Sequence, residues 1–97
     1  MTAILVIDDD DDMRDFISMT LLRAGYEVQT ETDGERGMAA VKARLDTPFD
    51  LIISDIFMPG KDGIELLGSL RQLYPKIPVI AVTGGFTGVK KPYADSM

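Results

Sequence analysis

Two continuous apolar runs, each ending in aspartate, constrain the fold of this chain more than any other feature of its sequence. The runs are AILVI at residues 3–7 and LIIS within DLIISD at residues 50–55. Uninterrupted apolar residues are typical of strands covered on both faces, as in a parallel sheet with helices on either side. The sequence therefore predicts an α/β domain in which aspartates stand at the ends of buried strands.

Two further strands complete the predicted sheet. Residues 26–31 (YEVQTE) alternate like an edge strand, and residues 78–83 (PVIAVT) form an apolar run that predicts cover on both faces. Helical segments separate all four strands, so we expect a parallel sheet with right-handed crossovers and the flavodoxin-like strand order 2-1-3-4. The whole chain, residues 1–97, is then one domain with its core in residues 3–83 and a short tail at 84–97.

The three predicted helices follow from apolar spacing and from start and stop signals. The first ends at Gly25, the second begins with a capping box formed by Thr32 and Glu35, and the third ends before Pro75. In the third helix, four apolar residues are expected to lie on one side. They are Ile64, Leu67, Leu70 and Leu73.

Charge and composition exclude several classes of function. The chain carries a formal charge of −6 and no histidine, which argues against nucleic acid or an anionic membrane as its main partner and favours a cation. It has no cysteine, so disulfides, thiolate metal sites and thiol catalysis are excluded. The apolar run near its start is too short for a signal peptide or a membrane span. We therefore expect a cytoplasmic protein.

Polar residues at the carboxyl ends of the strands predict a binding site. Asp8 and Asp9 follow the first strand, Asp55 ends the third and Thr83 ends the fourth. In an open α/β sheet these ends meet at one crevice, where ligands bind. Carboxylates this close repel one another or recruit a divalent cation, and a partial oxygen shell completed by a phosphate suits Mg²⁺.

The chain resembles the receiver domains of two-component response regulators in four stretches. They are ILVIDDD, LIISDIFMPGKDG, VIAVTGG and KKP, and the resemblance runs without a gap over residues 3–83. It implies that Asp55 accepts a phosphoryl group, and that Mg²⁺ is held by Asp55, Asp9 and the Phe57 carbonyl, with Asp8 acting largely through water. It also implies that Thr83 and Lys91 hold phosphoryl oxygens.

The same resemblance implies a role in signalling and not an enzyme with its own output reaction. The phosphoryl donor would be a histidine kinase or a phosphotransfer protein, and the signal would pass to a downstream protein target. The alternative is a pseudo-receiver, a domain of this fold that serves for dimerisation or interaction while phosphotransfer is impaired.

The tail is shorter than the family pattern between Thr83 and Lys91. Receiver domains place a helix and a fifth strand there and a final helix afterwards, whereas the eight steps from Thr83 to Lys91 span at most about 27 Å. A parallel return strand needs a longer crossover, so we expect no regular fourth helix, fifth strand or final helix. The tail could turn back antiparallel along strand four, stay as a loop beside the site with Lys91 reaching Asp55 in its own subunit, or add to a neighbouring chain. We favour the last two routes. In the third, the uncovered edge of strand four, or exchanged tails, would join two copies in a homodimer.

Overall fold

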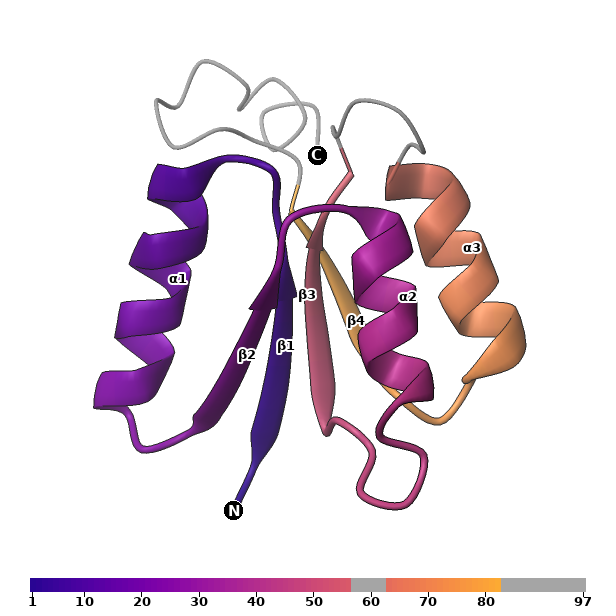
Figure 1. Cartoon of the computed structure of the whole chain (residues 1–97), viewed down its shortest axis with the longest axis horizontal. Helices are drawn as coiled ribbons and strands as arrows, with labels where there is room; N and C mark the ends of the chain where they lie inside the picture. The colour runs from indigo at the N-terminus through magenta and orange to yellow at the C-terminus, as the bar shows by residue number, and fades with distance from the viewer. Residues whose placement is uncertain (57–62, 83–97) are drawn as a thin grey trace, which may run out of the picture.

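The computed structural model describes residues 1–56 and 63–82, which form a parallel sheet with helices on both faces (Figure 1). Helices and strands alternate along the chain. They are β1 (Ala3–Ile7), α1 (Asp11–Arg23), β2 (Glu27–Glu31), α2 (Gly34–Lys42), β3 (Leu51–Asp55), α3 (Gly63–Leu73) and β4 (Val79–Val82). The strands lie in the order β2-β1-β3-β4 and all pairs are parallel, as the sequence predicts.

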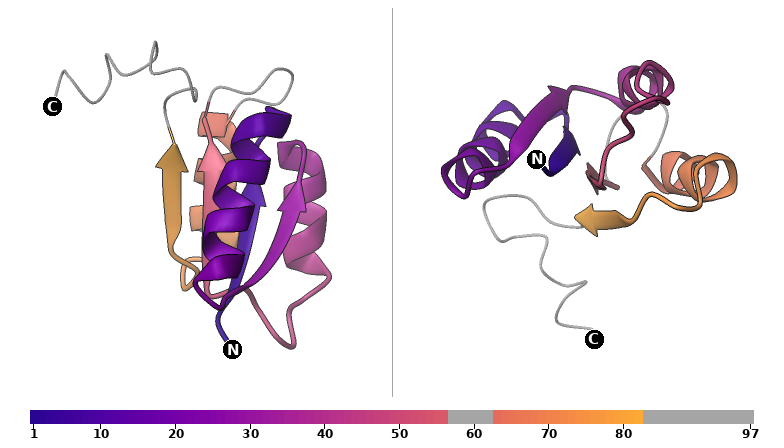
Figure 2. Two further views of the ribbon diagram at one scale, coloured as in Figure 1. Left: turned by 90° about the vertical axis from the view of Figure 1, so that its left-hand side faces the viewer. Right: turned by 90° about the horizontal axis from the view of Figure 1, so that it is seen from below.

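The helices are divided unequally between the two faces of the sheet. Helix α1 covers one face, and α2 and α3 lie side by side on the other, as the end-on view in Figure 2 shows. The main core lies between the sheet and the α2–α3 pair. It consists of Ala3, Leu5, Ile7, Ala40, Val41, Phe49, Ile52, Leu66 and Leu70. On the α1 face, the sheet residues Ile4 and Val6 are buried, but α1 itself has no fully buried residue.

The buried side of α3 differs from the sequence prediction. Leu66 and Leu70 are buried with Gly63, whereas Ile64 and Leu73 are more than half exposed. A step of three residues falls short of a full helical turn by about 60°, so a row at this spacing drifts around the helix. Ile64 and Leu73 therefore lie on opposite sides, and only part of the predicted row reaches the core.

The start of α2 also differs from the prediction. The N-cap is Asp33, whose side chain accepts a 2.8 Å hydrogen bond from the Arg36 amide. The predicted capping box of Thr32 and Glu35 is therefore wrong by one position. An aspartate accepts this hydrogen bond at least as well as a threonine, which explains why the adjacent residue serves as the cap.

Strand β4 is covered less than the sequence predicts. Val79 packs against the core, but Ala81 is exposed and Ile80 is 51% exposed. Cover on both faces is therefore not found in the part of the chain that the structure describes. Thr83 and the tail at 84–97 lie outside it, so the absence of a regular fifth strand and final helix stays a prediction.

Gly63 determines how closely α3 approaches the end of β3. A Cβ atom added at Gly63 would overlap the Asp55 carbonyl oxygen and the Ile56 Cα atom, both of which belong to the backbone and cannot rotate away. Gly68, five residues further along the same helix, has nothing within 4 Å of the same position. The two glycines therefore form a matched pair for mutation.

We expect Gly63→Ala to lower the free energy of unfolding by at least about 2 kcal/mol, because the backbone must shift to remove the overlap. Gly68→Ala should raise the free energy of unfolding by about 0.5–1 kcal/mol. At an exposed position inside a helix, alanine loses less conformational entropy on folding than glycine does. Urea denaturation followed by circular dichroism measures both changes. A similar small effect at the two positions would contradict the close approach of α3 to Asp55.

Candidate metal centre

Three carboxylates converge where β1 and β3 end. The strands are neighbours, and Ile7 pairs with Ser54, so the residues that follow them lie at the same edge of the sheet. One carboxylate oxygen from each of Asp8, Asp9 and Asp55 lies within 4.8 Å of the others. The Asp8 and Asp55 residues are 2% and 7% exposed, and Asp9 is exposed. The structure thus brings together the three acidic residues that the sequence places at strand ends.

Hydrogen bonds hold the loop that carries Asp8 and Asp9. The Asp8 amide donates to the Glu31 carbonyl over 3.1 Å, which extends the pairing of β1 with β2 by one residue. The Asp10 amide donates to the Asp8 carboxylate over 2.9 Å. Asp10 in turn caps α1 by accepting from the amides of Asp12 and Met13. The aspartate run therefore has two roles, with Asp8 and Asp9 in the site and the next three residues at the helix start.

Arg14 is a neighbour of the site that the sequence reasoning missed. Its Nη1 atom donates a 2.8 Å hydrogen bond to the Asp8 carbonyl oxygen, and its Nη2 atom forms an ion pair with the Asp11 carboxylate. Its side chain is 14% exposed, little for an arginine in a surface helix. The sequence did carry a signal for this role: Arg14 is the one arginine in residues 8–15, a segment with six aspartates.

The pKa of Asp8 is raised to about 6, mainly because burial disfavours its charged form. The hydrogen bond from the Asp10 amide lowers this pKa, while the negative charges of Asp55, Asp9 and Asp10 raise it further. Above this pH the ionised Asp8 destabilises the folded protein. A bound cation would offset the repulsion.

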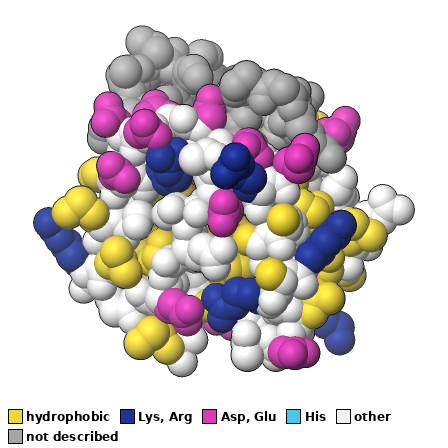
Figure 3. All heavy atoms as spheres, viewed as in Figure 1, with side chains coloured by type: hydrophobic (Ala, Val, Ile, Leu, Met, Phe, Trp, Pro, Cys, Tyr) yellow, Lys and Arg dark blue, Asp and Glu magenta, His cyan; other side chains and the backbone are white. Residues whose placement is uncertain are grey.

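The ligand set suits a hard divalent cation such as Mg²⁺. All three side chains offer carboxylate oxygens, and a site of one to three carboxylates leaves positions for water or a phosphate. Acidic side chains also gather in the upper half of the space-filling view in Figure 3, toward the end of the molecule where β1 and β3 end. Phe57, Thr83 and Lys91, the other residues predicted for this site, lie outside the described residues.

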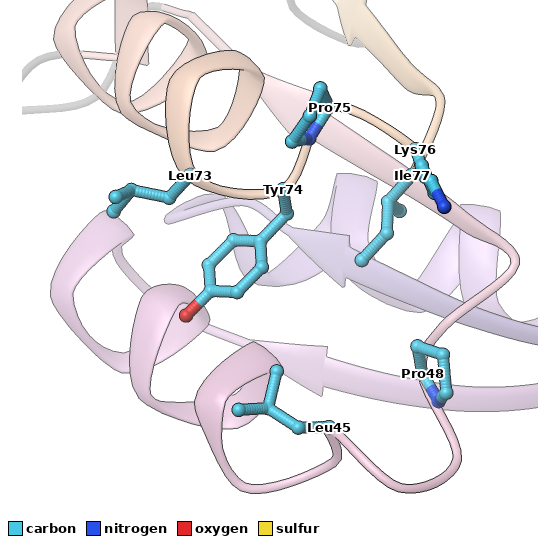
Figure 4. Close-up of a pocket in the computed structure, with 7 residues that line it drawn as sticks. All are labelled: Leu45, Pro48, Leu73, Tyr74, Pro75, Lys76 and Ile77. Carbon is cyan, nitrogen blue, oxygen red and sulfur yellow. The ribbon is translucent and has the colours of Figure 1, made fainter.

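A hollow of about 310 Å³ lies away from the carboxylates, around the carboxyl end of α3 (Figure 4). Its lining consists of Leu45, Pro48, Leu73, Tyr74, Pro75, Lys76 and Ile77. These side chains are mainly apolar and include no carboxylate, so the hollow offers no ligands of the kind found at the strand ends.

The fold and the acidic cluster define a receiver-type domain, and comparison with known proteins agrees. The chain matches the response regulator receiver domain over residues 4–91. It therefore belongs to the family of response regulator receiver domains of two-component systems.

Among curated proteins, the chain is 35% identical over 96 residues to the response regulator receiver protein CpdR of Brucella abortus (strain 2308). This alignment covers 99% of the chain and 78% of CpdR. FleR of Pseudomonas aeruginosa and ArlR of Staphylococcus aureus are longer relatives, and the chain spans 16% and 36% of their lengths.

Among solved structures, the chain resembles the chemotaxis response regulator CheY4 of Vibrio cholerae, with 37% identity and a TM-score of 0.77 over 99% of this chain and 79% of that one. It also resembles the response regulator TrrA of Thermotoga maritima in complex with Mg²⁺-BeF, with 26% identity and a TM-score of 0.73 over 99% and 97% of the two chains. A structure of TrrA in complex with the histidine kinase ThkA is also similar. The chain matches it with 31% identity and a TM-score of 0.75, over 97% of this chain and 80% of the matched one.

None of the helices that the structure describes has the length and apolar character needed to cross a bilayer.

The raised pKa of Asp8 predicts how stability depends on pH without a divalent cation. A carboxyl group whose pKa is higher in the folded than in the unfolded protein stabilises the fold at low pH, and this contribution is lost as pH rises from about 4 to about 6. Asp8→Asn removes the charge and keeps an oxygen for the Asp10 amide. We therefore expect the variant to exceed the wild type in free energy of unfolding at pH 7, by at most about 3 kcal/mol.

Urea denaturation in the presence of a chelator, from pH 4 to 7.5, measures the difference in free energy of unfolding between Asp8→Asn and the wild type. This difference should grow with pH. Asp46→Asn, at an exposed carboxylate, is the control and should show no such growth. A constant difference between Asp8→Asn and the wild type across this range would contradict the raised pKa.

Proposed function

We propose that the chain is a phosphoacceptor in two-component signalling, with Asp55 as the acceptor and with Asp9, Asp55 and, largely through water, Asp8 holding Mg²⁺. One observation carries the proposal: in a chain that belongs to the receiver family, the carboxylate that ends β3 lies within 4.8 Å of two others that follow β1. Lone acidic residues at strand ends are common, but their convergence from two strands at the ligand-binding edge is specific.

Each residue of the site has a role in the proposed transfer of a phosphoryl group to Asp55. A side-chain oxygen of Asp55 attacks the phosphorus of the donor, the bond from phosphorus to the donor's imidazole nitrogen breaks, and an acyl phosphate forms on Asp55. Bound Mg²⁺ would neutralise charge on the transferring group. Following the family pattern, we assign to the Phe57 carbonyl a metal contact beside those of the three carboxylates, and to Thr83 and Lys91 the binding of phosphoryl oxygens.

The partners follow from the same chemistry. These 97 residues contain no histidine, so they supply no phosphohistidine of their own, and we assign the phosphoryl donor to a histidine kinase or a phosphotransfer protein. The complex of TrrA with the kinase ThkA supports a partner of this kind. We assign the protein to the cytoplasm. We assign its output to contacts with a downstream protein, because its charge of −6 disfavours nucleic acid and anionic membranes as partners.

Phosphorylation of Asp55 is tested by intact-mass measurement after incubation with phosphoramidate and Mg²⁺. The wild type should gain about 80 Da, the mass of one phosphoryl group, and Asp55→Asn should gain none because an amide oxygen is a poor nucleophile. Asp46→Asn should label like the wild type. Undiminished labelling of Asp55→Asn would exclude Asp55 as the acceptor, and a folded wild type without any label would favour the pseudo-receiver alternative.

We further propose that two copies associate through the edge and the open face of β4. Among the described residues β4 pairs only with β3, and Ala81 and Ile80 on it are exposed. A second copy would bury this surface, and exchange of residues 84–97 would place Lys91 in the partner's site.

Sedimentation equilibrium at micromolar concentrations should therefore show a dimer. Ile80→Lys should shift it toward the monomer by at least about tenfold in dissociation constant, because a charge would be buried in the contact. Leu73→Lys, at a similarly exposed leucine on α3, is the matched control and should leave the equilibrium unchanged. A wild type that stays monomeric would contradict the association.

A further inference from the structure

Arg14 holds the backbone on both sides of Asp9. Its Nη1 atom donates to the Asp8 carbonyl over 2.8 Å, and its own amide donates to the Asp10 carbonyl over 2.9 Å. Its Nη2 atom pairs with Asp11. The Arg14 side chain is 14% exposed, and these contacts hold it in one conformation. An arginine fixed in this way loses much conformational freedom.

Within the acidic cluster, Asp9 is the residue whose carboxylate position depends most on the backbone that carries it. Asp8 and Asp55 are buried among their neighbours, whereas Asp9 is exposed. The position of its carboxylate therefore depends on the peptide that joins it to Asp8, and the oxygen of that peptide accepts the hydrogen bond from Arg14. A polar group that orients a metal ligand in this way raises metal affinity without touching the metal.

We propose that Arg14 is a positioning residue for the metal centre, in that its guanidinium holds the Asp8–Asp9 peptide so that the Asp9 carboxylate stays within reach of Asp8 and Asp55. This proposal rests on the proposed function, since it assumes that the three carboxylates bind Mg²⁺.

The charge of Arg14 and its hydrogen bond act on Mg²⁺ binding in opposite directions. A positive charge near the carboxylates repels Mg²⁺, so removing the charge alone strengthens Mg²⁺ binding. Removing the hydrogen bond frees the Asp8–Asp9 peptide and weakens binding. The sign of the change in affinity therefore distinguishes a positioning role from a purely electrostatic one.

The test compares Arg14→Met with the wild type by calorimetric titration with Mg²⁺ and by phosphoramidate labelling at increasing Mg²⁺ concentrations. We expect the Mg²⁺ concentration at half-saturation to rise about tenfold in both measurements. The extent of labelling at saturating Mg²⁺ should stay within about twofold of the wild type, because the acceptor itself is intact. A residue that only stabilises α1 would lower the melting temperature and leave half-saturation unchanged.

Arg36→Met is the matched control. Arg36 also pairs with an aspartate three residues before it, Asp33, near the start of a helix, and its loss changes the net charge by the same amount. For Arg36→Met we expect the Mg²⁺ concentration at half-saturation to stay within about twofold of the wild type, since exposed ion pairs contribute little to stability. Asp11→Asn removes the partner of the Arg14 ion pair and leaves the Asp8 carbonyl as an acceptor, so it should also have little effect.

Arg14→Lys keeps the charge and one donor, and it should recover part of the affinity lost in Arg14→Met. It also covers the case in which the methionine variant fails to fold. Unchanged or tighter Mg²⁺ binding in Arg14→Met, or a lysine variant that binds as weakly as the methionine variant, would overturn the positioning role. A wild type that binds Mg²⁺ but takes no label would refute the proposed function and leave the Arg14 comparison valid. A wild type that binds no Mg²⁺ would refute both.

Discussion

The parallel pairing of β1 with β3 is the constraint on which the rest of the structure depends. Its register sets Ile7 beside Ser54, and so brings Asp8 and Asp55 to one edge of the sheet although α1, β2 and α2 separate them in sequence. Side chains alternate between the faces of a strand, so a slip by one residue would turn Asp55 to the other face. The same slip would move the apolar residues of β3 out of the core. Burial therefore protects the geometry of the acidic cluster.

Strands β1 and β3 were predictable because each is a short apolar run that ends at an aspartate and is buried in the sheet. Residues 3–7 form β1 with the predicted bounds, and β3 begins one residue later than predicted. The helices were harder because several residues fit a pattern equally well. Leu66 was missed because Leu67 also satisfies the spacing from Leu70, and only the approach of α3 to the sheet decides which leucine is buried. Asp33 and Thr32 are adjacent capping candidates, and a local pattern does not choose between them.

The acidic cluster was predictable from the same runs, since Asp8 and Asp9 follow the buried run of β1 and Asp55 ends that of β3. Arg14 was not, because its contact is made to a backbone carbonyl six residues earlier, and a carbonyl is present at every position of every sequence. Only the path of the loop from β1 to α1 brings that oxygen within reach. Phe57, Thr83 and Lys91 stay predictions, because they rest on the family pattern and lie outside the described residues.

The polar contacts described around Asp8 fix its position without neutralising its charge. The Asp10 amide is a neutral donor, and the Arg14 guanidinium donates to the Asp8 carbonyl and pairs with Asp11 outside the cluster. Since burial and three neighbouring carboxylates raise the Asp8 pKa, these contacts keep a strained arrangement of charge in place at neutral pH. A cation that enters such a site meets ligands already ordered, so the entropy of arranging them is not lost on binding. The repulsion that destabilises the fold without a cation becomes, for the same reason, part of the affinity for one.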